Sequence, residues 1–312
     1  MAFYYGKLDI LVKIWYNILT IEGVVYMKEI CLTESAVSRL KQYPLDDVFS
    51  SESTIYYLKK DQDRHNVLLK KLFLTDEKRV GRKIDTIRTL QDSELSEYEE
   101  LVIPDELVTI SGVKSGFTLR EIEDATNLHL FLNDHRIPKK DKITVLKKIG
   151  ELLRRVQSQK QEFYFGDLQS YNFLVGKDLD IHAVDLDSSA VSRKKPLETK
   201  YVIIDKKSHG VPKYKVNKMG RSYPNRNVDI FCYNTLVLNY LAGRPMHKLS
   251  FEEYFDYINY LEECGMPKDM IDIYLNLYTD KNNESVVDDL DSLPDDYGRV
   301  DYRVYTALRK RH

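Results

Sequence analysis

The order of hydrophobic and polar positions divides the chain into a strand-rich part followed by a helical part. Two runs of β-branched, aromatic and apolar residues, 47–60 and 64–74, flank the turn "DQD" and predict a β-hairpin. Residues 76–92 then place apolar side chains three or four positions apart behind an acidic first turn, which predicts an amphipathic helix. Residues 107–123 predict another pair of strands, turning at "SGVKSG".

Helical spacing dominates from residue 127 onward. The predicted helices cover residues 127–135, 141–159, 228–243, 250–265 and 268–280. Three short strand-like pieces, "FYFGD", "YNFLV" and "IHAVDLD", follow the long helix, and each presents a polar group at its end. We therefore predict an α+β fold with a small strand-rich lobe and a larger helical lobe, divided near residues 120–126.

Composition excludes several classes of protein. A chain of 312 residues that is 43% hydrophobic can form one large or two medium globular domains. Its formal net charge of −2 gives no global excess of either sign, so we expect neither nucleic acid nor a membrane as a partner. Three cysteines, Cys31, Cys232 and Cys264, lie far apart without a CxxC pair. This pattern favours reduced thiols in a cytoplasmic compartment over disulfides or a zinc site.

The N-terminal residues 8–26 are apolar enough to resemble a signal or membrane segment. Lys13, Asn17 and Glu22 interrupt the run, and it has neither a basic start nor a small-residue cleavage site. We expect an amphipathic or partner-packed helix, with a poorly ordered extension or a membrane anchor as the alternatives. Farther along, "TESAVSRL" (33–40) has the form of a short capped helix, which allows a partner-binding or DNA-binding extension as a third reading of the chain.

The polar groups at the strand ends predict a catalytic site. Asn172 follows Asp167 by five residues, and Asp185 follows Asn172 by thirteen. In this order, a kinase-type phosphotransferase supplies a base for the acceptor hydroxyl, an amide oxygen for one metal ion, and a carboxylate for the metals that bridge the nucleotide phosphates. Asp187 has two readings, as a local hydrogen-bonding group or as a second metal ligand.

The motif "GDLQSYNFLV…VDLDS" resembles the catalytic and metal-binding loops of the protein kinase-like superfamily, especially its bacterial and aminoglycoside-phosphotransferase-like branches. The resemblance covers roughly residues 47–280. It implies a bilobed fold in which a small antiparallel-sheet N-lobe occupies residues 46–124, after an extension over 1–45. A larger, mainly helical C-lobe then occupies residues 125–312 and ends in an acidic and then basic tail.

The same resemblance implies a set of functional residues. It implies that ATP binds with Mg²⁺ (or Mn²⁺) between the lobes, that Asp167 and Asn172 are catalytic, and that Asn172 and Asp185 bind the metal. The phosphate-contacting lysine aligns best with Lys70, and Lys71, on the opposite strand face, is the alternative. The segment "TLREIED" falls at the hinge, where backbone groups would meet adenine; its residues are Glu121, Ile122 and Glu123. Asp229, near a helix start, corresponds to the aspartate that braces the catalytic loop in kinases.

Three features depart from the kinase pattern. The segment "VFSSESTIYY" stands where a glycine-rich phosphate loop belongs and contains no glycine. The partner of Lys70 on the following helix is ambiguous, because Asp85 or Glu77 could serve while the pattern also aligns Arg88 there. Gln169 occupies the position where serine/threonine kinases usually carry a lysine.

We therefore expect an ATP-dependent phosphotransferase that moves the γ-phosphate to a hydroxyl of a protein (Ser/Thr) or of a small molecule. The alternative is a pseudokinase, a nucleotide-binding or scaffolding module with the same fold. Residues 192–221 hold ten Lys and Arg against two Asp and Glu, which indicates either a solvated loop or a site for an acidic acceptor. Residues 284–301 are acidic and interrupted by proline, which predicts a surface or semi-ordered tail.

Overall fold

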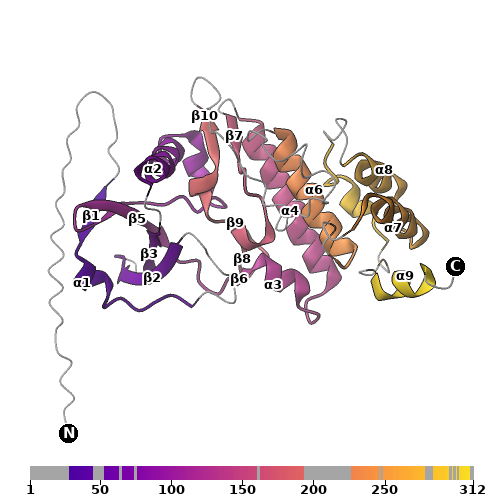
Figure 1. Cartoon of the computed structure of the whole chain (residues 1–312), viewed down its shortest axis with the longest axis horizontal. Helices are drawn as coiled ribbons and strands as arrows, with labels where there is room; N and C mark the ends of the chain where they lie inside the picture. Colours follow the sequence, from indigo (N-terminus) through magenta and orange to yellow (C-terminus); the bar gives the residue numbers. More distant parts are fainter. Residues whose placement is uncertain are drawn as a thin grey trace, which may run out of the picture. The chain divides into compact units, whose positions relative to one another are not determined.

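A computed structural model gives the fold of the chain (Figure 1). It describes residues 28–44, 53–62, 65–73, 76–159, 162–192, 226–244, 246, 249–277, 284–294, 297, 300 and 302–309. The predicted helix over 8–26, the loop before residue 53 and the basic segment from residue 193 to 221 lie outside the described residues. The described residues form two compact units, one within Met1–Ser96 and Val102–Ile122 and the other within Glu97–Leu101 and Glu123–His312.

The first unit contains a five-stranded sheet in the order β1-β4-β5-β3-β2. Its strands are β1 (Glu29–Leu32), β2 (Ser53–Lys60), β3 (Asn66–Leu72), β4 (Leu107–Ile110) and β5 (Val113–Arg120). The predicted hairpin is confirmed as the antiparallel pair β2–β3, and the predicted strand pair is confirmed as β4–β5. The sheet as a whole is mixed, however, because β1 pairs in parallel with β4. The predicted antiparallel pairing therefore holds among the strands within 46–124, and the sheet departs from it where β1 joins.

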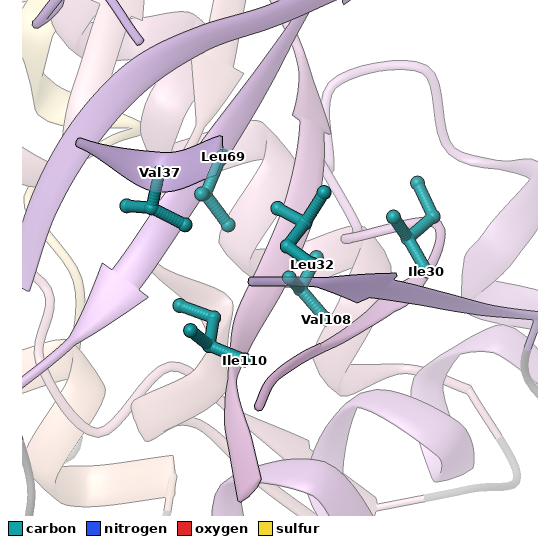
Figure 2. Close-up of a cluster of buried hydrophobic side chains, with 6 residues drawn as sticks. All are labelled: Ile30, Leu32, Val37, Leu69, Val108 and Ile110. Carbon is teal, nitrogen blue, oxygen red and sulfur yellow. The ribbon is translucent and has the colours of Figure 1, made fainter. Parts of the chain in front are cut away.

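The edge strand β1 belongs to the core of this unit. Its burial alternates along the chain, so Ile30 and Leu32 face inward. The predicted short helix is confirmed as α1 (Glu34–Val37), whose N-terminus is capped by the Thr33 hydroxyl, which accepts the Ala36 N–H at 3.1 Å. Figure 2 shows the resulting cluster of buried side chains from α1, β1, β3 and β4: Ile30, Leu32, Val37, Leu69, Val108 and Ile110. Residues that the sequence placed in an extension thus help to form the hydrophobic core.

The helix α2 (Glu77–Gln91) follows the hairpin, as predicted. Asp76 caps it by accepting the Lys78 N–H at 2.9 Å. The apolar residues at three-to-four spacing, Val80, Ile84 and Ile87 among them, are buried. The amphipathic pattern is therefore what fixes this helix against the unit.

The second unit is mainly helical. Its helices are α3 (Leu128–Asn133), α4 (Lys139–Gln157), α6 (Arg226–Leu241), α7 (Phe251–Glu263), α8 (Lys268–Asn276) and α9 (Tyr302–Arg309). Two small sheets accompany them, made of β6 (Thr126–Asn127), β8 (Phe173–Val175) and β9 (Ile181–Ala183), and of β7 (Glu162–Tyr164) and β10 (Ala190–Ser192). Both the long predicted helices and the three strand-like pieces between them are confirmed.

Helices α4 and α6 approach closely in the centre of this unit (Figure 1). Gly150 of α4 makes the approach possible, because a Cβ atom there would lie 2.6 Å from the Tyr233 hydroxyl and 2.6 Å from a methyl of Val287. The buried Tyr233 hydroxyl donates to the Leu146 carbonyl at 3.0 Å. A small residue is therefore required where the two helices meet.

The acidic C-terminal segment is packed, which corrects the predicted tail. In the described residues 284–294, Val286, Val287 and Leu290 are buried. Between them, Asp288 is exposed and pairs with Arg154 of α4, whereas Asp289 is half-buried. The few apolar residues fix the segment, while its composition is dominated by charge. Among the described helices of both units, none is long and apolar enough to cross a membrane.

Candidate active site

The centre of the candidate site is a buried carboxylate in the first turn of α6. Asp229 is fully buried, and its two oxygens accept the backbone N–H groups of Phe165 at 2.8 Å and Gly166 at 3.0 Å. The Gln157 side-chain amide also approaches Asp229, at 3.5 Å. A buried carboxylate is tolerated when it accepts several hydrogen bonds, and here it fixes the backbone immediately before Asp167.

Gly166 turns the chain at this anchor. Its φ of 70° lies in the left-handed region, which glycine adopts without strain. Because Asp229 fixes the N–H groups of Phe165 and of Gly166 itself, Asp167 leaves the turn in a defined direction. Phe165 adds to the anchor, since its ring packs on Phe163 and Phe173 with centroids 4.9 and 5.9 Å apart.

The Asp167 side chain is held by two amides of its own loop. Gln169 Nε2 lies 3.1 Å from each carboxylate oxygen, and Asn172 Nδ2 donates to Oδ2 at 3.0 Å. Asn172 Nδ2 also donates to the Asp167 carbonyl at 2.9 Å. The five-residue spacing therefore brings Asp167 and Asn172 into direct contact. Since the Asn172 amide uses its nitrogen in these contacts, its Oδ1 is the atom that can act as a ligand.

The hairpin of β8 and β9 places Asp185 next to this loop. Phe173 pairs with Ala183, and the Val184 N–H donates to the Asn172 carbonyl at 2.9 Å, which extends the ladder by one residue. Asp185 follows at once, with φ 63° and ψ 34°. A left-handed backbone at a non-glycine residue is uncommon and is concentrated at functional sites, although aspartate tolerates it better than most residues.

Two further groups lie close to these carboxylates. Asp187 is buried and accepts a hydrogen bond from the Ser188 hydroxyl at 3.4 Å. This contact agrees with the interpretation of Asp187 as a local hydrogen-bonding group. Burial raises the pKa of the Cys232 thiol on α6, and the charges of Asp229 and Asp167 raise it further. Cys232 is therefore a neutral core residue beneath the loop.

An aromatic pair flanks the loop, which the sequence analysis missed. The Tyr171 ring stacks on His129 of α3, with centroids 4.6 Å apart and planes inclined by 27°. Asn127 connects the two elements, because its side chain caps α3 at the His129 N–H and donates to the Tyr171 carbonyl at 3.0 Å. Such contacts between residues distant in sequence leave no local signal. Only the presence of Tyr171, an aromatic residue in an otherwise polar loop, could have suggested that the loop contacts another element.

The remaining predicted residues belong mostly to the first unit. Lys70 is buried in β3, with 8% of its surface exposed. Lys71, on the opposite strand face, forms an ion pair with Glu34 at 3.3 Å. The structure therefore distinguishes the two lysines, because Lys71 serves the contact between β3 and α1, and Lys70 is the buried one.

The carboxylates predicted to pair with Lys70 lie on the exposed side of α2. Glu77 and Asp85 are exposed, Arg88 is half-buried, and the polar residues on the buried face are Lys83 and Thr86. Neither candidate carboxylate therefore lies on the face that packs into the first unit.

The predicted hinge coincides with the division between the units. Ile122 is the last residue of the first unit, and Glu123 begins the long second part of the other. The Glu121 N–H donates to the Asn66 carbonyl at 3.0 Å, and its carboxylate accepts the Asn66 amide at 2.5 Å. The Glu121 N–H is thus used within the first unit and is not available for the predicted contact with adenine.

The donor set suits a hard cation that also binds phosphate. Asn172 Oδ1 and the Asp185 carboxylate are oxygen donors, and Mg²⁺ is usually bound through one or two carboxylates together with substrate phosphates and water. In the part of the chain that the structure describes, His, Cys, Asp and Glu form no cluster of three or more that would hold a metal by itself.

The sequence was compared with protein-family models and with curated proteins. No protein-family model matches the chain, and no curated protein is significantly similar to it.

Proposed function

We propose that the chain is an ATP-dependent phosphotransferase with a bilobed protein kinase-like fold, which transfers the γ-phosphate to a hydroxyl of a protein or a small molecule. The observation that carries the proposal is the chain of contacts from Asp229 to the catalytic loop. Asp229 fixes the backbone of Phe165 and Gly166, and the next residue, Asp167, is held by the Asn172 amide. A half-buried carboxylate held in this way suits a general base that must meet an acceptor hydroxyl in one orientation.

The proposal gives each of the predicted residues a role. Asp167 would orient the acceptor hydroxyl and accept its proton. Asn172 Oδ1 and Asp185 would hold Mg²⁺ (or Mn²⁺), which would neutralise charge on the transferring phosphoryl group. Lys70 would contact the nucleotide phosphates, and the backbone of residues 121–123 would contact adenine, as the resemblance implies.

The experiment that tests this proposal compares the parent with Asp167→Asn. The variant keeps the shape of the side chain and removes its capacity to accept a proton. We expect the rate of γ-phosphate transfer from ATP·Mg²⁺, to water or to the chain itself, to fall by roughly 10²- to 10⁴-fold. The shift in melting temperature caused by ATP·Mg²⁺ should be nearly unchanged, because Asp167 does not hold the nucleotide.

Asp178→Asn is the matched control, since Asp178 is an exposed aspartate in the turn between β8 and β9. It should behave like the parent in both assays. A parent that is not stabilised by any nucleotide, with or without metal, would contradict the proposal. So would an Asp167→Asn variant that turns over at the parent rate.

The second candidate is a pseudokinase that binds nucleotide and serves as a scaffold. The observation that favours it is the position of Glu77 and Asp85 on the exposed side of α2, where neither suits the lysine partner that active kinases need. The candidates differ in measurable behaviour. A pseudokinase would give a melting shift with ATP and no transfer of γ-phosphate under any metal condition.

A further inference from the structure

We propose that Gln169 is a positioning residue, which sets the orientation of the Asp167 carboxylate for phosphotransfer. The proposal rests on the function proposed above and adds a residue to which no role was assigned. Its basis is that Gln169 Nε2 lies 3.1 Å from Oδ1 and 3.1 Å from Oδ2 of Asp167. A donor that reaches both oxygens restrains rotation of the carboxylate about its last torsion, which is otherwise broad and roughly two-fold.

The local backbone directs the Gln169 side chain to this contact. Gln169 precedes the 3₁₀ turn Ser170–Asn172 with extended φ and ψ, and its side chain does not cap that turn. The backbone carbonyl of Gln169 satisfies the turn instead, by accepting the Asn172 N–H at 3.0 Å. The turn therefore does not require the amide, and the side chain reaches back to Asp167.

The two amides hold different parts of Asp167. Asn172 Nδ2 contacts the backbone carbonyl and Oδ2, which fixes one side of the residue. Gln169 Nε2 contacts both oxygens, and together with the Asn172 contact to Oδ2 it restrains the plane of the carboxylate. A general base acts only when a lone pair points at the proton it receives, so the plane matters as much as the position.

This role explains why an amide side chain can stand at Gln169, the position where serine/threonine kinases usually carry a lysine. An amide keeps the hydrogen-bond donor and omits the positive charge. If the donor is what the loop requires, another donor at this position should serve, and a side chain of similar length without a donor should fail.

The test uses the full chain with ATP·Mg²⁺ and measures release of inorganic phosphate. We expect Gln169→Met to lower kcat by roughly 10- to 100-fold with the KM for ATP unchanged, because positioning acts on the chemical step. Gln169→Lys should recover most of this loss, and Gln169→Glu should be at least as impaired as the methionine variant, since it sets two carboxylates together. Gln159→Met is the matched control outside the loop and should keep the parent kcat.

The results separate this inference from the proposed function. Parent-like kcat in Gln169→Met, or equal impairment of the methionine and lysine variants, would overturn the positioning role while leaving the phosphotransferase intact. If the parent itself releases no phosphate, the proposed function fails, and a crystal structure of Gln169→Met decides the inference alone. More than one orientation of the Asp167 carboxylate would support it, and one parent-like orientation would overturn it.

Discussion

Replacement of Asp229 by asparagine is the most direct test of how the loop that carries Asp167 is held. The carboxylate accepts the Phe165 N–H at one oxygen and the Gly166 N–H at the other. An asparagine side chain keeps one acceptor and turns the second position into an NH₂ group that faces a backbone N–H. The variant therefore loses one hydrogen bond to a charged acceptor and leaves a buried amide N–H unsatisfied.

The magnitude follows from the burial of the site. A hydrogen bond to a charged group contributes about 1.5–3 kcal/mol, and an orphaned buried donor costs about 1–3 kcal/mol. The neutral amide is less costly to bury than a carboxylate, which offsets part of the loss. We expect the loop to open about 2–4 kcal/mol more easily, which corresponds to a fall of roughly 30- to 700-fold in the protection of its amides.

The assay is hydrogen exchange of the Phe165 and Gly166 amides in the parent and in Asp229→Asn. Asp272→Asn, at an exposed aspartate of α8, is the matched control and should leave these amides unchanged. Amides of β2 and β3, in the first unit, should also exchange at the parent rate. Equal protection of Phe165 and Gly166 in parent and variant would refute the view that Asp229 anchors the loop.

The remaining predictions test the metal, the packing and the surface charge. Asp185→Asn keeps a side chain that tolerates the left-handed backbone. It should therefore abolish only the metal-dependent part of the change in melting temperature that ATP causes. A metal-dependent change equal to that of the parent would exclude Asp185 as a ligand. Gly150→Ala should destabilise α4 by about 1–2 kcal/mol, because overpacking outweighs the gain in helix propensity. Gly81→Ala, with no atom within 4 Å of the new Cβ, should instead stabilise α2 by about 0.5–1 kcal/mol. Hydrogen exchange measures both changes in stability, and two changes in the same direction would contradict the packing argument. The hydrogen bond from Arg154 lowers the pKa of Asp288, so the pair contributes stability above the unfolded pKa of about 4 and loses it as pH falls through the folded pKa. Urea unfolding should show Asp288→Asn less stable than the parent by a few tenths of a kcal/mol at neutral pH, with no difference below the folded pKa; a difference that persists in acid would refute the linkage.

Much of the fold could be predicted because its signals are local. The periodicity of α2 and the hairpin turn between β2 and β3 are both set by residues within about one element length. The parallel strand β1 could not be predicted in this way. Its partner β4 begins at Leu107, far along the chain from Glu29, and a four-residue alternation of buried and exposed positions has no power to select a partner or a direction.

The C-terminal segment was predicted wrongly for a related reason. Its charge suggested a solvated tail, because composition averages over all positions. Burial is decided by the few apolar positions, here Val286, Val287 and Leu290. A methyl of Val287 lies against Gly150 of α4, and the Val286 N–H donates to Asn234 of α6, so these contacts join residues distant in sequence. A segment can therefore be acidic overall and still complete a core.

In the candidate site, too, features set by neighbouring residues could be predicted and contacts between distant residues could not. The spacing of Asp167 and Asn172 is a sequence property, and the contact between them follows from it. The ion pair between Lys71 and Glu34 could not be predicted, because Glu34 lies on a helix outside the residues that the resemblance covers. The contact of Gln169 with Asp167 depends on a side-chain torsion, which the sequence specifies only through the finished loop.

The electrostatics of the loop link these observations to the proposed chemistry. The donors described above for Asp167 and Asp229 are backbone N–H groups and side-chain amides, which stabilise a carboxylate without neutralising its charge. Asp185 and Asp187 add two more carboxylates within the following turn. If the cation of the proposed function binds at Asp185, it would bring positive charge to this part of the chain. In the phosphotransferase proposed above, the Gln169 and Asn172 amides would keep the Asp167 carboxylate in one orientation, which is what a base must have to accept the proton of an acceptor hydroxyl.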